Sequence, residues 1–252
     1  MFSIAIPSYK RSETLNKKTL TALKNEGFLP HQITVFVANE EERESYLRNL
    51  DPSLYGTLVV GVLGIGNQRK FILEHYPLGH PILMVDDDVR KFKKIGEWHL
   101  PTLFQKTFDY CLREGIPAWS LYPVSNPLSM KSRIRVGLHL LVGSCFGVFA
   151  TEGPDYSGCP HGVKEDYVTS FVLYQASKKL LRLEFLAVDT TYWNGKGGLQ
   201  GIRTDDIERQ ASEYLARLYP QFVKDVYTRK NGRPDIHLRK LPVFLLPPET
   251  LA

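Results

Sequence analysis

The first ninety residues alternate between short apolar runs and longer segments of mixed polarity. In the longer segments apolar side chains recur every three or four positions, as Leu20 and Leu23 do, and this spacing predicts helices. Short links between such strands and helices are typical of a parallel sheet with crossover helices. Strands are predicted at residues 2–6, 33–38, 58–62 and 81–85, and helices at 12–26, 40–50 and 66–76.

The pattern becomes mixed after residue 90. The basic and aromatic segment 89–98 is predicted to be a hairpin or loop, and the proline-rich segment 241–248 an edge segment. Asp205 followed by Glu208 resembles a capping box that opens a helix. Helices are also predicted at 101–114, 163–178 and 205–219, and strands at 118–121, 181–188 and within 134–150, where a turn falls near Gly143. We therefore expect an α/β fold: a mostly parallel central sheet flanked by helices, with a smaller mixed β region in the C-terminal half.

Composition excludes several classes of protein. The chain has 252 residues, of which 43% are hydrophobic and 23% charged, which excludes a disordered tail, a fibrous repeat and a disulfide miniprotein. The formal net charge of +5 permits a polyanionic partner without requiring one. Three widely spaced cysteines are typical of a reducing compartment, and neither a signal-peptide core nor a bilayer-length apolar run is present. We expect a cytoplasmic protein that does not bind membranes.

Three adjacent carboxylates, Asp86-Asp87-Asp88, follow the fourth predicted strand directly. In a strand, residues i and i+2 point to the same side, so Asp86 and Asp88 can converge on one cation while Asp87 points elsewhere. Ligands of open α/β sheets bind at the carboxyl ends of the strands, and a divalent cation relieves the repulsion among the carboxylates. The alternative is a solvated acidic turn. The position after an apolar strand favours a metal site.

In these motifs the sequence resembles the GT-A fold glycosyltransferases, especially those similar to family 2. Residues Ile4 to Arg11 resemble their first strand and loop, and residues 64–70 (Gly-Ile-Gly-Asn-Gln-Arg-Lys) their glycine-rich helix start. Asp86-Asp87-Asp88 resembles their D-x-D motif and Glu165-Asp166 their later acidic pair. His237 falls where many of these enzymes carry a C-terminal metal-binding histidine.

Within this group the chain looks most like the TET-associated DNA glycosyltransferases of phages and the related base J glucosyltransferase. The resemblance implies one GT-A domain over residues 1–252, with a nucleotide-sugar-binding half at 1–90 and an acceptor-binding half at 91–252. It also implies a UDP-sugar donor, UDP-glucose or a similar nucleotide sugar, and Mn²⁺ or Mg²⁺ held by Asp86, Asp88 and His237. For a phage-encoded protein, the location would be the cytoplasm of the host cell.

The expected donor site combines residues from the ends of several strands. A helix N-terminus with open backbone N–H groups suits a phosphate or ribose, and Arg69 projects one turn into that helix. Structural alternatives remain: a plain turn for Pro7 and Tyr9, solvent pairing for Arg11, and a helix N-terminal role for Glu40. The predicted donor-binding residues are Pro7, Tyr9, Arg11, Asn39, Glu40, Gly66, Arg69 and Asp86.

The catalytic candidates are Glu165 and Asp166, which precede the apolar face of a predicted helix. Inverting glycosyl transfer needs a carboxylate that takes the proton of the acceptor hydroxyl. The alternative for one of the two acids is that it only complements the helix dipole. We favour Asp166 as the base.

The acceptor is predicted from clusters of cations. One follows the aspartates directly and includes an aromatic residue, which suits phosphates and an unstacked base, although a solvated charged hairpin is the alternative. The expected acceptor is a 5-hydroxymethylpyrimidine in DNA, reached by base flipping or in a single strand. The predicted DNA-binding residues are Arg90, Lys91, Phe92, Lys93, Lys94, Arg133 and Arg135.

Two other functions remain open at this stage. A GT-A enzyme acting on a glycan or lipid-linked acceptor would show no salt-sensitive DNA binding, and the lack of an amphipathic anchor argues against the lipid version. A non-catalytic nucleic-acid-binding module on the same fold is the second alternative. The intact Asp86-Asp87-Asp88, Arg69 and Glu165-Asp166 argue against such a decayed enzyme.

Overall fold

The computed structural model describes residues 1–153, 162–190 and 204–251. Its N-terminal half is a parallel sheet, in which β1 (Ser3–Pro7) lies between β2 (Ile33–Val37) and β4 (Pro81–Val85), and β3 (Thr57–Val60) extends β2. The connecting helices are a continuous segment of α1 (Ser12–Leu15), the π-helical η1 (Asn16–Leu20) and α2 (Thr21–Asn25), then α3 (Glu40–Asn49) and α4 (Ile65–His75), with a 3₁₀ turn, η2 (Pro30–Gln32), before β2.

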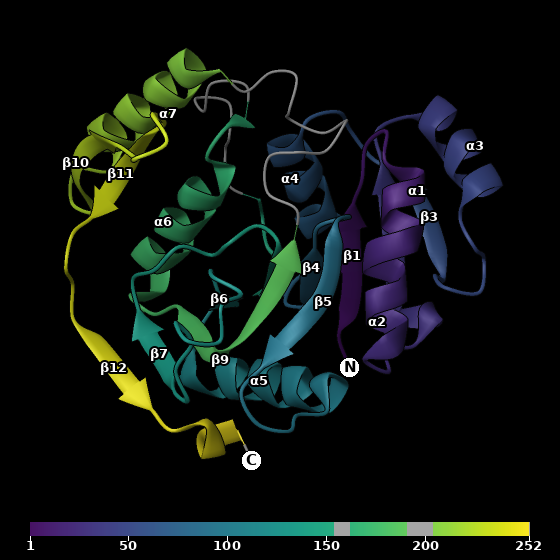
Figure 1. Ribbon diagram of the computed structural model, residues 1–252, viewed down its shortest axis with the longest axis horizontal. Coiled ribbons are helices and arrows are strands. Elements are labelled where there is room, and N and C mark those ends of the chain that lie inside the picture. The colour runs from purple at the N-terminus through teal and green to yellow at the C-terminus, as the bar shows by residue number, and fades with distance from the viewer. Residues whose placement is uncertain (154–161, 191–203, 252) are drawn as a thin grey trace.

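The C-terminal half continues the same sheet with mostly antiparallel pairs (Figure 1). Its strands are β5 (Val89–Lys94), β6 (Ala118–Tyr122), β7 (Ile134–Gly137), β8 (Cys145–Phe149), β9 (Leu181–Thr190) and β12 (Val243–Leu246). Its helices are α5 (Leu100–Glu114), α6 (Glu165–Ser177), α7 (Asp205–Leu218) and the 3₁₀ turn η5 (Pro248–Leu251), while β10 (Val223–Thr228) and β11 (Pro234–Leu238) form a separate hairpin. The sheet order is β12-β7-β9-β6-β8-β4-β1-β2-β3, with β5 paired to β9.

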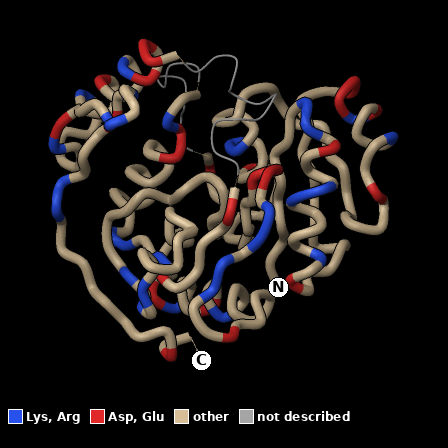
Figure 2. The backbone as a smooth tube through the Cα atoms, viewed as in Figure 1, with Lys and Arg blue, Asp and Glu red and all other residues tan. Residues whose placement is uncertain are grey.

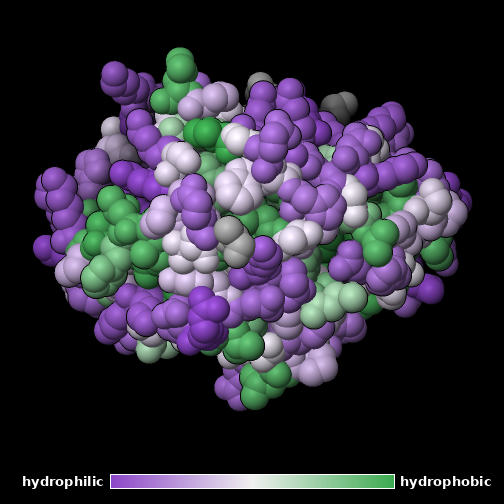
Figure 3. All heavy atoms as spheres, turned by 90° about the horizontal axis from the view of Figure 1, so that it is seen from below, coloured by the Kyte–Doolittle hydropathy of each residue, from purple (hydrophilic) through white to green (hydrophobic). Residues whose placement is uncertain are grey.

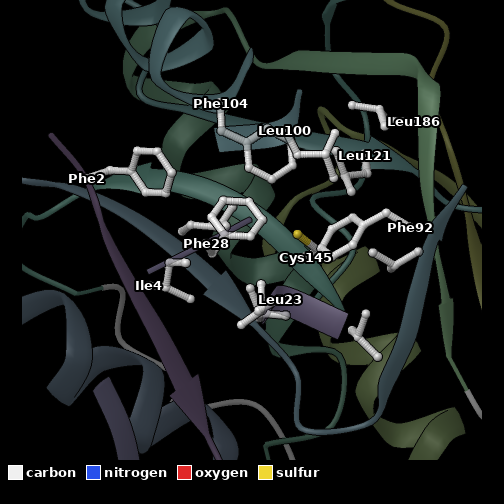
Figure 4. Close-up of a cluster of buried hydrophobic side chains, with 14 of the residues drawn as sticks. Phe2, Ile4, Leu23, Phe28, Phe92, Leu100, Phe104, Leu121, Cys145 and Leu186 are labelled. Carbon is white, nitrogen blue, oxygen red and sulfur yellow. The ribbon is translucent and has the colours of Figure 1, made fainter. Parts of the chain in front are cut away.

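Two apolar layers enclose this sheet. Alternate residues of each central strand point to opposite faces, so Ile4 and Ile6 join one cluster and Ala5 the other. The first cluster lies under α2 and α5 and is rich in aromatic rings, among them Phe28 and Phe104, which stack at 5.8 Å (Figure 4). The second lies under α4 and α6. The sheet is therefore covered on both faces, and polar groups reach solvent at the strand ends.

The predicted fold class is confirmed: helices flank a large mixed sheet whose first four strands are parallel. The predicted edge segment is β12, an outer strand that exposes Val243, Phe244 and Leu245. The face of the molecule seen from below is mostly hydrophilic, with several apolar patches (Figure 3). Among the described residues no helix is both long and apolar enough to cross a membrane. Cys111 and Cys145 are buried thiols, and Cys159 lies outside the described residues.

Two local predictions are wrong. Segment 89–98 is no isolated hairpin, because its first six residues form β5 and pair with β9. The cap of α7 is Thr204, whose Oγ1 accepts a hydrogen bond from Ile207 N at 3.2 Å, so Asp205 stands one position inside the helix. The hairpin β10–β11 is absent from the predicted elements.

Candidate functional site

The three aspartates at the end of β4 have different partners. Asp87 is buried: its carboxylate accepts from Ser8 Oγ at 2.7 Å and from Arg11 Nη1 at 3.2 Å. The Asp88 carboxylate lies 3.8 Å from Arg11 Nη1, and Asp86 accepts from an arginine of α4. The side chains of Asp86 and Asp88 are 35% and 18% exposed, against 7% for Asp87. Asp87 thus faces the protein, as the sequence predicts, and the other two carboxylates reach solvent.

Burial first, and the neighbouring carboxylates second, disfavour the ionised form of Asp86 and Asp87. Burial raises the pKa of Asp86 to about 7; the Arg69 guanidinium opposes the rise, and the nearby carboxylates add to it. Burial likewise raises the pKa of Asp87 to about 6 against the opposing charge of Arg11, and raises the pKa of Asp88. A cation at the solvent side of Asp86 and Asp88 would relieve this repulsion.

The loop after β1 is fixed by a hydrogen-bonded network around Asp87. Because the single Ser8 hydroxyl proton goes to Asp87, the Tyr46 O–H donates to Ser8 Oγ, 2.7 Å away. The same Tyr46 oxygen accepts from Arg11 N at 3.0 Å. Burial raises the pKa of Tyr46, which keeps the phenol protonated. Helix α3, which carries Tyr46, therefore sets the position of Arg11 beside the aspartates.

The turn itself is held by Thr19. Its Oγ1 donates to the carbonyl of Asp86 at 2.8 Å and accepts from Val89 N at 2.9 Å, spanning the triplet. Thr19 is buried and lies in η1, a π-helical turn, which is a rare element often found at functional sites.

We expect Thr19→Val to lower the free energy of unfolding by about 1–3 kcal/mol for each backbone group left unsatisfied. Urea denaturation measures the loss. Thr19→Ser, which retains the hydroxyl, and Thr21→Val, an exposed threonine one residue beyond η1, should both remain near the parent. Equal stability of Thr19→Val and the parent would contradict the role of this hydroxyl.

Arg69 joins the aspartates to the start of α6. Its Nη2 donates to Asp86 Oδ1 and to the carbonyl of Gly143, both at 3.0 Å, and its Nη1 donates to Glu165 Oε1 at 2.5 Å. The guanidinium also lies 5.5 Å from the Phe146 ring centre. A Cβ at Gly143 would come within 2.6 Å of Arg69 Nη2, so glycine is required there for this approach. Arg69 thus binds two carboxylates of the protein, and its contact with a nucleotide-sugar donor stays a prediction.

The two acids at the start of α6 differ in their surroundings. Glu165 is buried and paired with Arg69, whereas Asp166 is partly exposed and its Oδ1 accepts from Tyr167 N at 3.0 Å. The preceding Lys164 is buried in a left-handed conformation, and its Nζ lies 3.1 Å from carboxylates of both Glu208 and Asp235. These ion pairs anchor the N-terminus of α6. Because Glu165 is buried against Arg69, Asp166 is the more accessible acid.

The remaining donor candidates fall into two groups. Pro7 ends β1, Tyr9 is partly exposed in the following loop, and Gly66 lies in the first turn of α4. Asn39 caps α3 by accepting from Glu42 N at 2.9 Å, and Glu40 pairs with Arg43 at 3.5 Å, so both have structural roles in the helix. No contact of these residues distinguishes a nucleotide-binding role, which stays a prediction.

The structure does not bring His237 to the aspartates. Its Nδ1 lies 2.5 Å from Asp225 Oδ1, and its ring stacks on Tyr227 at 3.7 Å within the β10–β11 hairpin. Within residues 1–153, 162–190 and 204–251, no three His, Cys, Asp or Glu side chains form a group that could hold a metal. Two carboxylates, Asp86 and Asp88, are therefore what this turn can offer a cation.

The predicted DNA-binding residues do not form one surface. Phe92 is buried in the core against Phe28 and Phe104, because β5 turns this face toward the sheet interior, so its proposed stacking on a base is wrong. Lys91 is exposed and Lys93 partly so. Arg90 pairs with Asp189 and Lys94 with Glu26, at 2.8 and 2.7 Å. Arg133 immediately precedes β7 and Arg135 belongs to it, and β7 pairs with the opposite end of β9.

Sequence reasoning missed Ser8, Thr19, Tyr46 and Gly143. Thr19 carries a usable signal, since it is a polar residue four positions after Leu15, on the apolar side of its helix. Tyr46 is the aromatic residue of an otherwise charged helix. Ser8 lies inside a motif that the sequence singles out, but its partners are remote in the chain.

No protein-family model and no curated protein matches the sequence. The architecture is that of the GT-A class, and solved structures share it. A mannosyltransferase, PcManGT from Pyrobaculum calidifontis, solved with GDP-Man and Mn²⁺, is similar with a TM-score of 0.51 and 12% identity over 87% of this chain and 63% of that one.

Two further structures are similar at lower scores. TarS of S. aureus has a TM-score of 0.49 and 16% identity over 92% of this chain and 44% of its own. Glucosyl-3-phosphoglycerate synthase from Mycobacterium tuberculosis, with Mg²⁺ and UDP, has a TM-score of 0.48 and 11% identity over 100% and 91% of the two chains. The chain spans less than two thirds of both TarS and the mannosyltransferase.

Proposed function

We propose that this protein is a metal-dependent nucleotide-sugar glycosyltransferase. The observation that supports it is the carboxylate turn at the carboxyl end of β4, which gathers Arg11, Arg69 and the acidic start of α6 around Asp86 and Asp88. Ligands of α/β sheets bind at this edge. The fold is shared with a mannosyltransferase whose structure contains GDP-Man and Mn²⁺.

The donor set of the turn fits a divalent cation of the Mg²⁺ type. Such a cation takes one or two protein carboxylates and completes its coordination with water and substrate phosphates. Asp86 and Asp88 offer two carboxylates whose pKa values burial raises, and this charge is unfavourable without a cation. Bound there, Mn²⁺ or Mg²⁺ would neutralise the charge of the leaving diphosphate.

The residues around the turn have separate roles in this reaction. Asp87 and Tyr46 hold the loop that carries Arg11, so its guanidinium stands beside the cation-binding edge. Arg69 fixes Asp86 relative to Glu165, and with it the start of α6. Asp166, the accessible acid, takes the proton of the acceptor hydroxyl.

For the donor and acceptor we propose UDP-glucose and a 5-hydroxymethylpyrimidine in DNA. The support is the resemblance to DNA glycosyltransferases and the position of Lys91 and Lys93 on β5, which starts one residue after the aspartates. Cations so close to the site would hold a phosphate backbone while a base is turned toward Asp166.

Transfer of label tests this proposal. The protein is incubated with UDP-[¹⁴C]glucose, Mn²⁺ and DNA that contains 5-hydroxymethyluracil, 5-hydroxymethylcytosine or neither. Label in one of the modified DNAs, dependent on Mn²⁺, is the expected result. Hydrolysis of UDP-glucose without label in DNA would retain the transferase and reject the acceptor, and no turnover of any nucleotide sugar would reject the enzyme.

We expect Lys91→Gln combined with Lys93→Gln to weaken DNA binding and to reduce its salt dependence. The slope of log K against log salt is negative, and each lost phosphate contact reduces its magnitude by about one unit. The double variant should therefore have a slope that is shallower by about two units. Gel shifts at rising salt measure it. Lys106→Gln with Lys179→Gln, exposed lysines outside β5, is the matched control. An unchanged slope would remove β5 from the DNA-binding surface.

A further inference from the structure

Positive charge exceeds negative charge where β7 and β9 pair. Arg135 lies directly opposite Arg182 in the antiparallel register, and like charges in this position repel. One buried carboxylate, Glu184, serves two guanidiniums, accepting from Arg133 Nε and Arg182 Nη2 at 2.6 Å each. Among the described residues Arg135 makes no ion pair of its own, although the charge of Glu184 acts on it as well. β7 and β9 carry one cation each, Arg135 and Arg182, and the tube of Figure 2 is blue at several positions in this part of the sheet.

Buried N–H donors in the same place lack acceptors. The Nε atoms of Arg135 and Arg182 are both inaccessible to water and without a hydrogen-bond partner. His139, two residues after β7, is 3% exposed, and its ring nitrogens face the backbone of Gly137 and Leu181. Burial lowers the pKa of His139, and the charges of Arg182 and Arg135 lower it further, so the two guanidiniums act on this ring.

Such an arrangement is costly without a ligand. Buried donors almost always have partners, and like charges that face each other across a pair of strands are destabilising. An oxyanion on the solvent side of Arg135 would offset the facing like charges, because it brings negative charge to guanidinium groups whose geometry matches it. Arg133 and Arg135 are partly exposed, so an ion can reach the cluster from solvent.

We propose that Arg135 and Arg182 form a binding site for a phosphate-type oxyanion, either free phosphate or a phosphate group of a nucleic acid. The site is distinct from the carboxylate turn. Thr190, at the far end of β9, pairs with Val89 beside the aspartates, whereas Arg182 is eight residues earlier, roughly 25 Å along the strand. The inference does not depend on the proposed glycosyl transfer.

Thermal unfolding tests the site without donor, metal or sugar acceptor. At equal ionic strength, phosphate should raise the melting temperature of the parent by about 2–4 °C relative to chloride. Arg135→Gln removes the like-charged pair, so it should melt at or above the parent in chloride and lose the response to phosphate. Arg48→Gln, on the exposed side of α3, should retain the full response.

A ³¹P NMR titration of the parent with inorganic phosphate gives a second measure that does not depend on any variant folding. A short oligonucleotide that displaces the phosphate identifies a nucleic-acid source, and binding of phosphate without such displacement identifies the free ion; both outcomes support the site. Equal melting in phosphate and chloride with no NMR binding, or an undiminished response in Arg135→Gln, would overturn it.

Discussion

Asp88→Asn is expected to abolish metal-dependent glycosyl transfer while leaving the fold intact. A neutral amide keeps the shape of the side chain but loses the charge that holds a hard cation. Asp88 is the appropriate member of the triplet, because its ion pair with Arg11 is long, 3.8 Å, whereas Asp87 and Asp86 are closely bound by arginines. Turnover of UDP-glucose against Mn²⁺ concentration and thermal unfolding measure the two parts of the prediction.

A matched control separates the charge at this position from charge in general. Asp109→Asn removes an exposed carboxylate of α5 whose described partner is Gln105, and it should leave both turnover and metal dependence unchanged. If Asp88→Asn turns over at the parent's rate in EDTA, the aspartates do not hold a catalytic cation. A variant that has lost binding of Mn²⁺ but melts as the parent does would support the assignment directly.

The parts of the fold that the sequence predicts well are those set by local periodicity. The strand–helix alternation up to Val85 and the position of the aspartates at a strand end both follow from patterns of a few residues. The structure of segment 89–98 is harder to predict. One buried aromatic residue, Phe92, stands among four cations, and this hides the pattern of a half-buried strand. Pairing with β9, almost a hundred residues later, decides that structure.

The organisation of the candidate site depends on contacts that no local pattern contains. Asp87 meets Ser8 across 79 positions of the chain, and Arg69 meets Glu165 across 96. Sequence spacing offers Glu165 and Asp166 as near equals, and the structure distinguishes them by the burial of Glu165 and its ion pair to Arg69. His237 was placed at the metal by resemblance, and its contacts with Asp225 and Tyr227 lie in a hairpin that the sequence pattern did not predict.

Asp166→Asn is expected to lower turnover by about two to four orders of magnitude, the usual contribution of a general base, with donor binding nearly unchanged. The fold should survive, because an asparagine Oδ1 can still accept from Tyr167 N as Asp166 does. Glu165→Gln should behave differently: it leaves Arg69 buried beside Asp86 with one carboxylate fewer, and breaking a buried pair costs about 3–5 kcal/mol. Single-turnover kinetics, UDP-glucose binding and thermal unfolding of both variants measure these effects. A loss of turnover larger for Glu165→Gln than for Asp166→Asn, in a protein that melts as the parent does, would make Glu165 the base and Asp166 the residue that complements the helix dipole.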